Sequence, residues 1–293
     1  MSRAASAAAR LPRWLRRPLP GAGAAPALER LLRDLSLDTV CRAARCPNRG
    51  ECFSAGTATF LILGATCTRG CRFCAIEPGR PQPPRDDEPD AVAVAAGRLG
   101  LRHVVVTSVA RDDLPDGGAA HFARTIHSVR ARLPRSTVEV LIPDFGGDQT
   151  ALDAVLAARP DVLNHNVETV ARLHPLVRPR ADCARSLRVL ARAAASGVCT
   201  KSGLMLGLGE RDEEVRRLLV DLRTAGVRLL TIGQYLAPSP RHMPAARYAA
   251  PEEFNRWKSL ALEMGFAAVA AGPFVRSSYR ADRLYLAGAA AER

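Results

Sequence analysis

Short apolar runs rich in β-branched residues alternate along this chain with longer segments of helical periodicity. The apolar runs have the length and composition of buried strands, and the segments between them carry apolar residues at helical spacing. Because strands that alternate with helices form parallel βαβ units, the pattern predicts an α/β fold. The expected strands are residues 58–63, 103–108, 138–142, 162–166, 200–206, 229–233 and 267–271. The expected helices are residues 27–37, 89–100, 119–133, 150–158, 182–196, 210–225 and 251–264.

This number of βαβ units fits either a barrel or an open doubly wound sheet. Polar and glycine-rich residues gather directly after the strands, for example at 64–74 and 107–118. Barrels collect their chemistry on the loops at the carboxyl ends of the strands, and no G-x-G-x-x-G motif opens a helix as in a Rossmann domain. We therefore expect a partial or near-complete (β/α) TIM-type barrel at 57–272. Extensions at 27–56 and 273–293 should close over its mouth.

The first 26 residues form a separate basic segment, in which arginines occur without any acidic residue. The segment is either a mitochondrial presequence or a flexible basic arm. Its prolines would break a long amphipathic helix, which favours the arm. The sequence has no secretory apolar region and no apolar run near the ~20 residues of a membrane span. We therefore expect a cytoplasmic location, with the mitochondrial matrix as the alternative.

The chain carries a net charge of +13, and Lys201 and Lys258 are its only lysines. This charge reflects either a GC-rich genome, which encodes basic residues as arginine, or a surface that attracts an acidic partner. Aromatic residues make up only 5% of the chain, and no stacking platform or DNA-reading motif is visible. We therefore expect neither nucleic acid nor a membrane as a partner, although a basic RNA-binding module remains an alternative from charge alone.

Six of the eight cysteines lie between positions 41 and 74, in two groups of three. In a reducing compartment, thiols this dense indicate a metal or redox site rather than disulfides. Zinc usually takes four ligands in paired C-x2-C steps, and only one such step is present, whereas soft thiolates without histidine suit iron–sulfur clusters. A four-iron cube takes four ligands, so each group would leave one iron to a different ligand. The first trio is Cys41, Cys46 and Cys52, in a segment expected to be a loop wrapped on a metal, and the second is Cys67, Cys71 and Cys74.

The spacing Cys67-x3-Cys71-x2-Cys74, directly after the first strand, resembles the signature of the radical S-adenosylmethionine (SAM) enzymes. Together with Arg276-Ser277-Ser278-Tyr279, the first trio makes the chain resemble the lipoyl synthase family, and the resemblance covers nearly the whole sequence. One departure is Cys183, where the family pattern has tyrosine. Further matching stretches are TSV at 107–109, RDDL at 111–114, DGG at 116–118, VLIPDF at 140–145, NHN at 164–166, ETV at 168–170, TKSGLM at 200–205 and GQYL at 233–236.

The resemblance implies a barrel of the radical SAM kind with two [4Fe–4S] clusters. One cluster, on Cys67, Cys71 and Cys74, would bind SAM, whose cleavage by one electron gives a 5′-deoxyadenosyl radical. An auxiliary cluster on the first trio would take Ser278 as its fourth ligand. Serine oxygen is a hard ligand for a sulfide-rich cube, which suits a cluster that is consumed as the sulfur source. The alternative for Ser277 and Ser278 is a polar turn.

The implied reaction inserts sulfur at C6 and C8 of an octanoyl chain on a lysine of a lipoyl carrier domain. That carrier would be a 2-oxoacid dehydrogenase E2 subunit or the glycine cleavage H protein. The other implied partners are a one-electron donor such as flavodoxin or ferredoxin and an iron–sulfur cluster carrier. Two alternatives remain: another sulfur-inserting or methylthiolating radical SAM enzyme, and a regulatory protein that binds iron–sulfur or zinc.

Four polar residues at strand ends are candidates for binding SAM. Asn164, Asn166 and Glu168 close the fourth strand, where hydrogen bonds at the strand end or helix capping are the alternatives. Lys201 lies on an interior-facing strand, and because a buried lysine is seldom left unpaired, a polar site is expected there. Three further features are expected either to bind a ligand or to have only a structural role. They are the acid–base cluster at 111–113, the glycine-rich stretch 207–210 and Tyr235.

Overall fold

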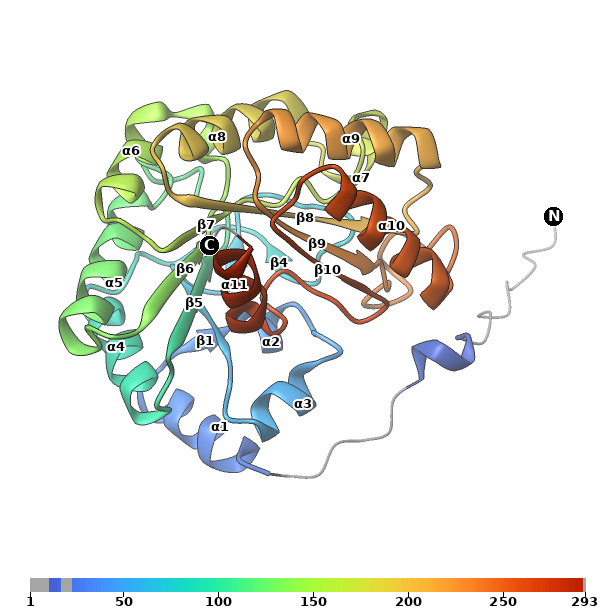
Figure 1. Ribbon diagram of the computed structural model, residues 1–293. Coiled ribbons are helices and arrows are strands. Elements are labelled where there is room, and N and C mark those ends of the chain that lie inside the picture. Colours follow the sequence, from blue (N-terminus) through green and yellow to red (C-terminus); the bar gives the residue numbers. More distant parts are fainter. Residues whose placement is uncertain (1–10, 17–22, 292–293) are drawn as a thin grey trace.

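The computed structural model describes residues 11–16 and 23–291 (Figure 1). Its main sheet has eight strands in the order β1-β2-β5-β6-β7-β8-β9-β10. All neighbours pair in parallel except β1, which is antiparallel to β2. The strands are β1 Asp38–Thr39, β2 Thr59–Ile62, β5 His103–Ser108, β6 Thr137–Leu141, β7 Val162–Asn164, β8 Cys199–Leu206, β9 Leu229–Gln234 and β10 Ala268–Gly272, and a small parallel pair is formed by β3 Thr66–Cys67 and β4 Glu77–Pro78. The seven expected strands are confirmed.

The helices lie around the outside of the curved sheet, as Figure 1 shows. They are α1 Ala25–Asp34, α4 Glu88–Arg98, α5 Ala119–Arg132, α6 Gln149–Ala157, α7 His174–Val177, α8 Cys183–Ala195, α9 Asp212–Thr224 and α10 Pro251–Glu263. Alternate strand residues such as Phe60, Ile62 and Val104 face these helices and form the core with them. Within the described residues no strand pairing joins β10 to β1, so the barrel is partial, as expected.

The C-terminal extension ends in helix α11, Ala281–Ala290, which lies in the centre of the ring of strands in Figure 1. Its Leu284 packs against Leu229 and Ala268, which begin β9 and β10, and Tyr285 stacks on His103, the first residue of β5. All these partners lie at the amino ends of the strands. The expectation that this extension closes over the barrel mouth is therefore wrong, because α11 caps the opposite end.

Two members of the first cysteine trio lie on short helices, Cys41 on α2 Val40–Ala43 and Cys52 on α3 Arg49–Ser54, whereas Cys46 lies on the loop between them, so the loop expected for the whole segment is found only at Cys46. The side chain of Thr39 accepts a hydrogen bond from the Arg42 amide and so caps α2. The side chain of Asn48, at the start of α3, donates to the Phe274 carbonyl at 2.7 Å. Tertiary contacts therefore supply the order that helices of this length cannot supply themselves.

Part of the basic N-terminal arm contacts the barrel. Arg13–Leu15 form one 3-10 turn in which Leu15 is buried, and the Trp14 indole donates to the Ala249 carbonyl at 3.1 Å. This stretch is held, in contrast to the flexible arm expected. Arm residues 1–10 and 17–22 lie outside the described residues.

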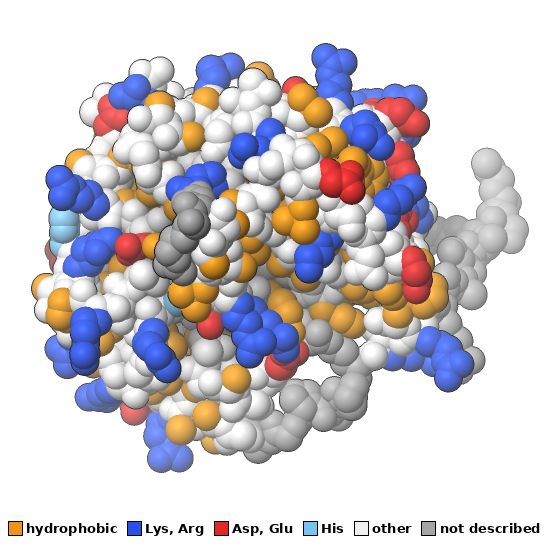
Figure 2. Space-filling view, viewed as in Figure 1, with side chains coloured by type: hydrophobic (Ala, Val, Ile, Leu, Met, Phe, Trp, Pro, Cys, Tyr) orange, Lys and Arg blue, Asp and Glu red, His pale blue; other side chains and the backbone are white. Residues whose placement is uncertain are grey.

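Basic side chains are spread over the face of the molecule that carries α11, interspersed with fewer acidic ones (Figure 2). They do not form one continuous patch on this face. In the described part of the chain, no helix combines the length and the apolar character needed to cross a membrane.

Candidate metal centres

The second cysteine trio lies on the loop that leaves the carboxyl end of β2. Backbone hydrogen bonds tie this loop to three other segments of the barrel mouth. Thr68 N–H donates to the Ala110 carbonyl at 3.1 Å, Arg72 N–H to the Val177 carbonyl at 3.0 Å, and Met243 N–H to the Arg72 carbonyl at 3.1 Å. Because these partners lie far apart in the sequence, the positions of the thiols are set by the whole mouth of the barrel.

Charged side chains fix the same loop from within. The buried Arg69 guanidinium binds Asp112 and Asp144, each at 2.7 Å. Arg111, which is 2% exposed, pairs with Asp113 at 2.8 Å and donates to the Leu63 carbonyl at 3.0 Å. Of the two roles expected for residues 111–113, the structure shows the loop salt bridge.

Two thiols of this trio, those of Cys71 and Cys74, are poorly suited to act as free nucleophiles. Burial raises the pKa of Cys71 and raises that of Cys74 to about 12, and repulsion from neighbouring thiols adds to both. The nearby Glu168 carboxylate also raises both values. A bound cation would reverse this balance, because metal coordination deprotonates thiols outright. The donor set therefore fits iron better than covalent catalysis.

Asn166 and Glu168 lie together beside this trio, and Arg178 joins them. Asn166 Nδ2 donates to Glu168 Oε1 at 3.1 Å, and Arg178 donates to the Asn166 carbonyl at 3.1 Å. Glu168 has a positive φ of 66°, and burial raises its pKa. Asn166 Oδ1 and Arg178 Nε are buried and have no partner among the described residues. The group therefore offers one acceptor and one donor to a bound molecule.

Asn164 and Lys201 lie deeper in the barrel, opposite each other on β7 and β8. Lys201 Nζ binds Glu139 Oε1 at 2.7 Å, Asn164 Nδ2 donates to the same oxygen at 3.3 Å, and His103 Nε2 lies 3.3 Å from Glu139 Oε2. Although burial opposes it, Lys201 and His103 lower the pKa of Glu139. The structure thus gives Lys201 a partner within the protein, and the hydrogen bonds of the Asn166 group do not include it.

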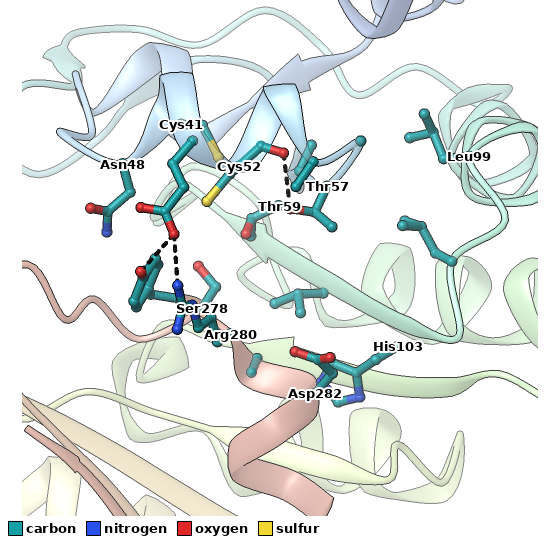
Figure 3. Close-up of a pocket in the computed structure, with 18 of the residues that line it drawn as sticks. Cys41, Asn48, Cys52, Thr57, Thr59, Leu99, His103, Ser278, Arg280 and Asp282 are labelled. Atoms are coloured by element: carbon teal, nitrogen blue, oxygen red, sulfur yellow. Dashed lines mark hydrogen bonds and ion pairs between the residues drawn. The ribbon is translucent and has the colours of Figure 1, made fainter. Parts of the chain in front are cut away.

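The first trio and Ser278 line one pocket of about 480 Å³. Figure 3 shows the Cys41 and Cys52 sulfurs directed into this space, with Ser278 across from them. Burial raises the pKa of Cys41 and raises that of Cys52 to about 12, with the neighbouring thiols adding to both. A bound cation would favour ionisation of Cys41 and Cys52, as it would for Cys71 and Cys74.

Glu51 of α3 ties the C-terminal segment to this pocket. Its Oε1 accepts from the Tyr279 hydroxyl at 2.7 Å and from Arg280 Nη2 at 3.0 Å, as Figure 3 shows. These two residues directly follow Ser278. Glu51 is thus in a position to hold the serine against the cysteine helices.

Neighbouring serines face different sites. Ser278 lines the pocket of the first trio, whereas Ser277 Oγ accepts from Asn166 Nδ2 at 2.5 Å. The segment approaches β9 closely because position 233 is glycine, where a Cβ would collide with the Val275 carbonyl oxygen. This close contact lets the C-terminal segment pass through the barrel, from the Asn166 group at Ser277 to the pocket of the first trio at Ser278.

The two trios lie at opposite ends of β2. Helices α2 and α3 precede this strand, and the other cysteine loop follows it. At ~3.3 Å per residue, a four-residue strand is about 13 Å long. Among the described residues, no three His, Cys, Asp or Glu side chains converge as they would on a single ion. A [4Fe–4S] cube does not require its ligands to converge on one point, because each ligand binds a separate iron.

Two weaker expectations are settled by contacts within the protein. The backbone amides of Gly207 and Leu208 donate to the Glu210 carboxylate at 2.7 and 2.8 Å, so this glycine-rich stretch binds the chain's own anion. Tyr235 is buried, and its hydroxyl donates to the Met243 carbonyl at 2.5 Å, which makes it a core residue.

Sequence reasoning missed three residues of these sites: Glu51, Glu139 and Arg178. The contacts of Glu139 with Lys201 and of Arg178 with Cys71 cross 62 and about a hundred positions, and no local spacing reveals them. Glu51 carries the weak signal of lying next to Cys52.

Comparison with solved structures supports the fold. Methylornithine synthase matches 80% of this chain and 73% of its own at 14% identity, with a TM-score of 0.56. SuiB of Streptococcus suis, solved with S-adenosylmethionine, matches 72% of this chain and 48% of its own at 8% identity, with a TM-score of 0.57. Both show that the partial barrel is of a known kind.

Sequence comparison identifies the family. The model of the radical SAM superfamily matches residues 61–222. A lipoyl synthase of Caldanaerobacter subterraneus is 56% identical over 87% of this chain and 90% of its own. Those of Oleidesulfovibrio alaskensis and Thermus thermophilus are 56% and 53% identical over 93% and 94% of this chain, and over 94% and 86% of their own. This chain therefore belongs to the lipoyl synthase family of the radical SAM superfamily, whose enzymes use a [4Fe–4S] cluster and SAM.

Proposed function

We propose that this enzyme inserts two sulfur atoms, at C6 and C8, into an octanoyl chain carried on a lysine of a lipoyl carrier domain. The observation that carries the proposal is the second thiol site. Three cysteines and Ser278 share one pocket at the end of β2 opposite to the radical SAM loop. Forming a substrate radical requires only one cluster, so a second ligand set suggests a separate source of sulfur.

Cys67, Cys71 and Cys74 would hold the cluster that binds SAM. With SAM bound, this cluster supplies a 5′-deoxyadenosyl radical, which removes hydrogen from unactivated carbon. The adjacent side chains are complementary to the cofactor's polar groups: Asn166 Oδ1 is an acceptor for a hydroxyl or ammonium group, and Arg178 Nε is a donor for a carboxylate. Glu168 adds a carboxylate beside them.

Asn164 and Lys201, the other two residues we expected at SAM, satisfy each other through Glu139. For them we propose a role in holding the interior of the barrel. Asn164 Oδ1 remains buried without a partner among the described residues, so it is available to a ligand in the interior.

Cys41, Cys46, Cys52 and Ser278 would hold the auxiliary [4Fe–4S] cluster, which supplies the inserted sulfur. The hard serine oxygen would keep one corner weakly bound. The protein's own contribution is positional. Thr59 contacts the Cys41 thiol with hydrogen bonds, and Glu51 holds the residues that follow Ser278.

The interior between the two sites suits an aliphatic chain. Leu61 and Val105 lie on the inner face of the sheet by strand alternation, whereas Val275 of the C-terminal segment fills the space over Gly233 on β9. These apolar side chains would shield a radical intermediate from water, and the charges of Lys201 and Glu139 in the same interior are paired with each other.

The proposed partners follow from this reaction. They are an octanoylated lipoyl carrier, either an E2 subunit or the H protein, a one-electron donor such as flavodoxin or ferredoxin, and an iron–sulfur carrier that rebuilds the auxiliary cluster. We also propose a cytoplasmic location, where reducing conditions keep the thiols available.

The test is an anaerobic reconstitution followed by product analysis. We expect about eight irons per chain for two cubes. With dithionite, SAM and an octanoyl-lysyl peptide, mass spectrometry should show 5′-deoxyadenosine and a peptide that gains two sulfurs. SAM cleavage without sulfur transfer would contradict the proposal.

Neighbouring serines provide a matched pair of variants. Ser278→Ala should leave SAM cleavage intact and abolish sulfur insertion, because only Ser278 lines the pocket of the first trio. Ser277→Ala should retain the full iron content and alter SAM affinity instead, through Asn166. Normal sulfur insertion by Ser278→Ala would remove this serine from the auxiliary site.

A further inference from the structure

Four exposed arginines lie on the loop that carries Cys67, Cys71 and Cys74 or close to a residue that contacts it. We define this arginine rim as Arg72, Arg80, Arg180 and Arg241. The backbone of Arg72 bonds to two of the segments that hold the loop, and Arg180 Nη1 donates to the Thr68 carbonyl at 3.0 Å.

The other two members flank the loop. Arg80 follows Gly79, whose amide donates to the Cys67 carbonyl at 2.9 Å. Arg241 precedes His242, whose Nε2 lies 3.1 Å from the Cys74 carbonyl oxygen. All four members therefore lie within a few residues of a contact to the thiol loop.

This rim retains its positive charge. The mouth carboxylates Asp112 and Asp113 are paired with the more buried Arg69 and Arg111. Arg80 lies near enough to Asp113 to lower the pKa of that carboxyl, but Arg111 is its ion-pair partner. No ion pair within 4 Å joins a rim arginine to a carboxylate of residues 11–16 or 23–291. Glu77 is the exposed acid on the same loop.

We propose that the arginine rim is the docking surface for an acidic one-electron-transfer protein. The inference rests on the proposed function and adds the place at which the electron enters. One electron passes from the docked protein, which is oxidised, to the cluster, which is reduced, for each SAM that is cleaved. Electron transfer weakens steeply with distance, so the donor must approach the thiol loop itself.

The carrier domain is a poorer match for this surface. It reaches its target through a long acyl-lysyl arm and can dock farther from the metal, whereas an electron donor brings its own redox centre on a rigid fold. Opposite charges also accelerate encounter by 10- to 10³-fold at low ionic strength, which suits a transient electron-transfer complex. The positive rim therefore favours a donor with an acidic face around its redox centre.

The test compares two double charge reversals that change the net charge equally. Arg80→Glu/Arg241→Glu alters the rim. Arg135→Glu/Arg217→Glu alters two exposed arginines away from it, one beyond α5 and one on α9. The rate of 5′-deoxyadenosine formation is measured with reduced flavodoxin as the probe and, separately, with saturating dithionite.

We expect the rim variant to lose at least about tenfold in its second-order rate with flavodoxin at low salt. Its rate with dithionite should match that of the wild type, and the control variant should be normal with both reductants. Equal losses in both variants would show a general charge effect and overturn the proposal, as would a normal rim variant. A normal rate with flavodoxin combined with a raised KM for the octanoylated carrier would assign the rim to the carrier instead. Absence of sulfur insertion with dithionite in the wild type would contradict the proposed function and not the docking surface.

Discussion

Replacing Lys201 with methionine tests whether this buried lysine serves the fold or binds SAM. Both Lys201 and Glu139 are 0% exposed, and their charged atoms lie 2.7 Å apart. Removing one partner leaves a buried charge uncompensated, which typically costs about 3–5 kcal/mol. His103 and Asn164 still contact Glu139, so we expect the lower part of that range.

The assay is the thermal midpoint of unfolding, Tm, measured anaerobically with and without SAM. For large domains, 1 kcal/mol shifts Tm by roughly 2–4 °C, so Lys201→Met should lower Tm by roughly 6–12 °C. The double variant Lys201→Met/Glu139→Leu should recover much of this loss, because it removes both charges. The increase in Tm caused by saturating SAM should be the same in all three proteins.

Two results would refute this reasoning. A single variant that melts within about 2 °C of the wild type would mean that the pair contributes little. A normal Tm combined with a lost response to SAM would mean that Lys201 contacts the cofactor. The second result would restore the assignment that the sequence alone suggested.

Two other predictions follow from particular contacts. Gly233→Ala should displace the segment that leads to Ser278 and halve the iron retained after gel filtration, because a Cβ at position 233 would collide with the Val275 carbonyl oxygen. The control Gly272→Ala should retain its iron, because a Cβ there meets only an ordinary contact at 3.5 Å. Full iron content in Gly233→Ala would contradict the argument that the C-terminal segment must pass close to β9 to reach the first trio. Although burial opposes it, Arg69 lowers the pKa of Asp144 from 3.8 to about 2. A lowered carboxyl pKa stabilises the fold above pH 4, and that stability is lost as the pH falls from about 4 to 2. Asp144→Asn should therefore show a shallower decline of Tm in that interval than the wild type, and parallel curves would argue against the pair.

Most of the sheet could be predicted from the sequence because its strands are continuous apolar runs between turn residues. The short helices around the first trio could not, because four- and six-residue helices show no periodicity and depend on contacts such as that of Asn48 with Phe274. The position of α11 was missed for a similar reason. Its apolar residues match the amino ends of distant strands, which only the folded barrel brings together.

Sequence spacing is most informative about chemistry where the candidate ligands are close together in the chain. Both cysteine trios are local, so their spacing alone predicts them as two ligand sets. The partners of Lys201 and Cys71 are distant in the chain, and so the pattern could suggest a polar site but not whether a cofactor or a carboxylate fills it. Ser278 was assigned from the family pattern, and the structure adds that its neighbour Ser277 faces the other site.

One strand anchors both candidate ligand sets, and we expect this arrangement to bear on regiochemistry. Thr39 of β1 pairs with Phe60 of β2 and caps the helix that carries Cys41. At the other end of β2, Leu63 is held at both backbone atoms, its amide by Glu88 at 2.8 Å and its carbonyl by Arg111 at 3.0 Å.

Rigid anchorage at both ends means that the span between the two sites is set by the length of β2, about 13 Å, and not by flexible loops. An acyl chain held in this span presents different carbons to the radical and to the sulfur according to its depth. If the contacts at either end of β2 loosened, the distance between the two sites would change. The carbon from which hydrogen is removed would then no longer lie beside the sulfur source. We therefore expect the contacts at Thr39 and Leu63 to influence which carbon atoms are modified, and substitutions there should change the ratio of the sulfur-containing products.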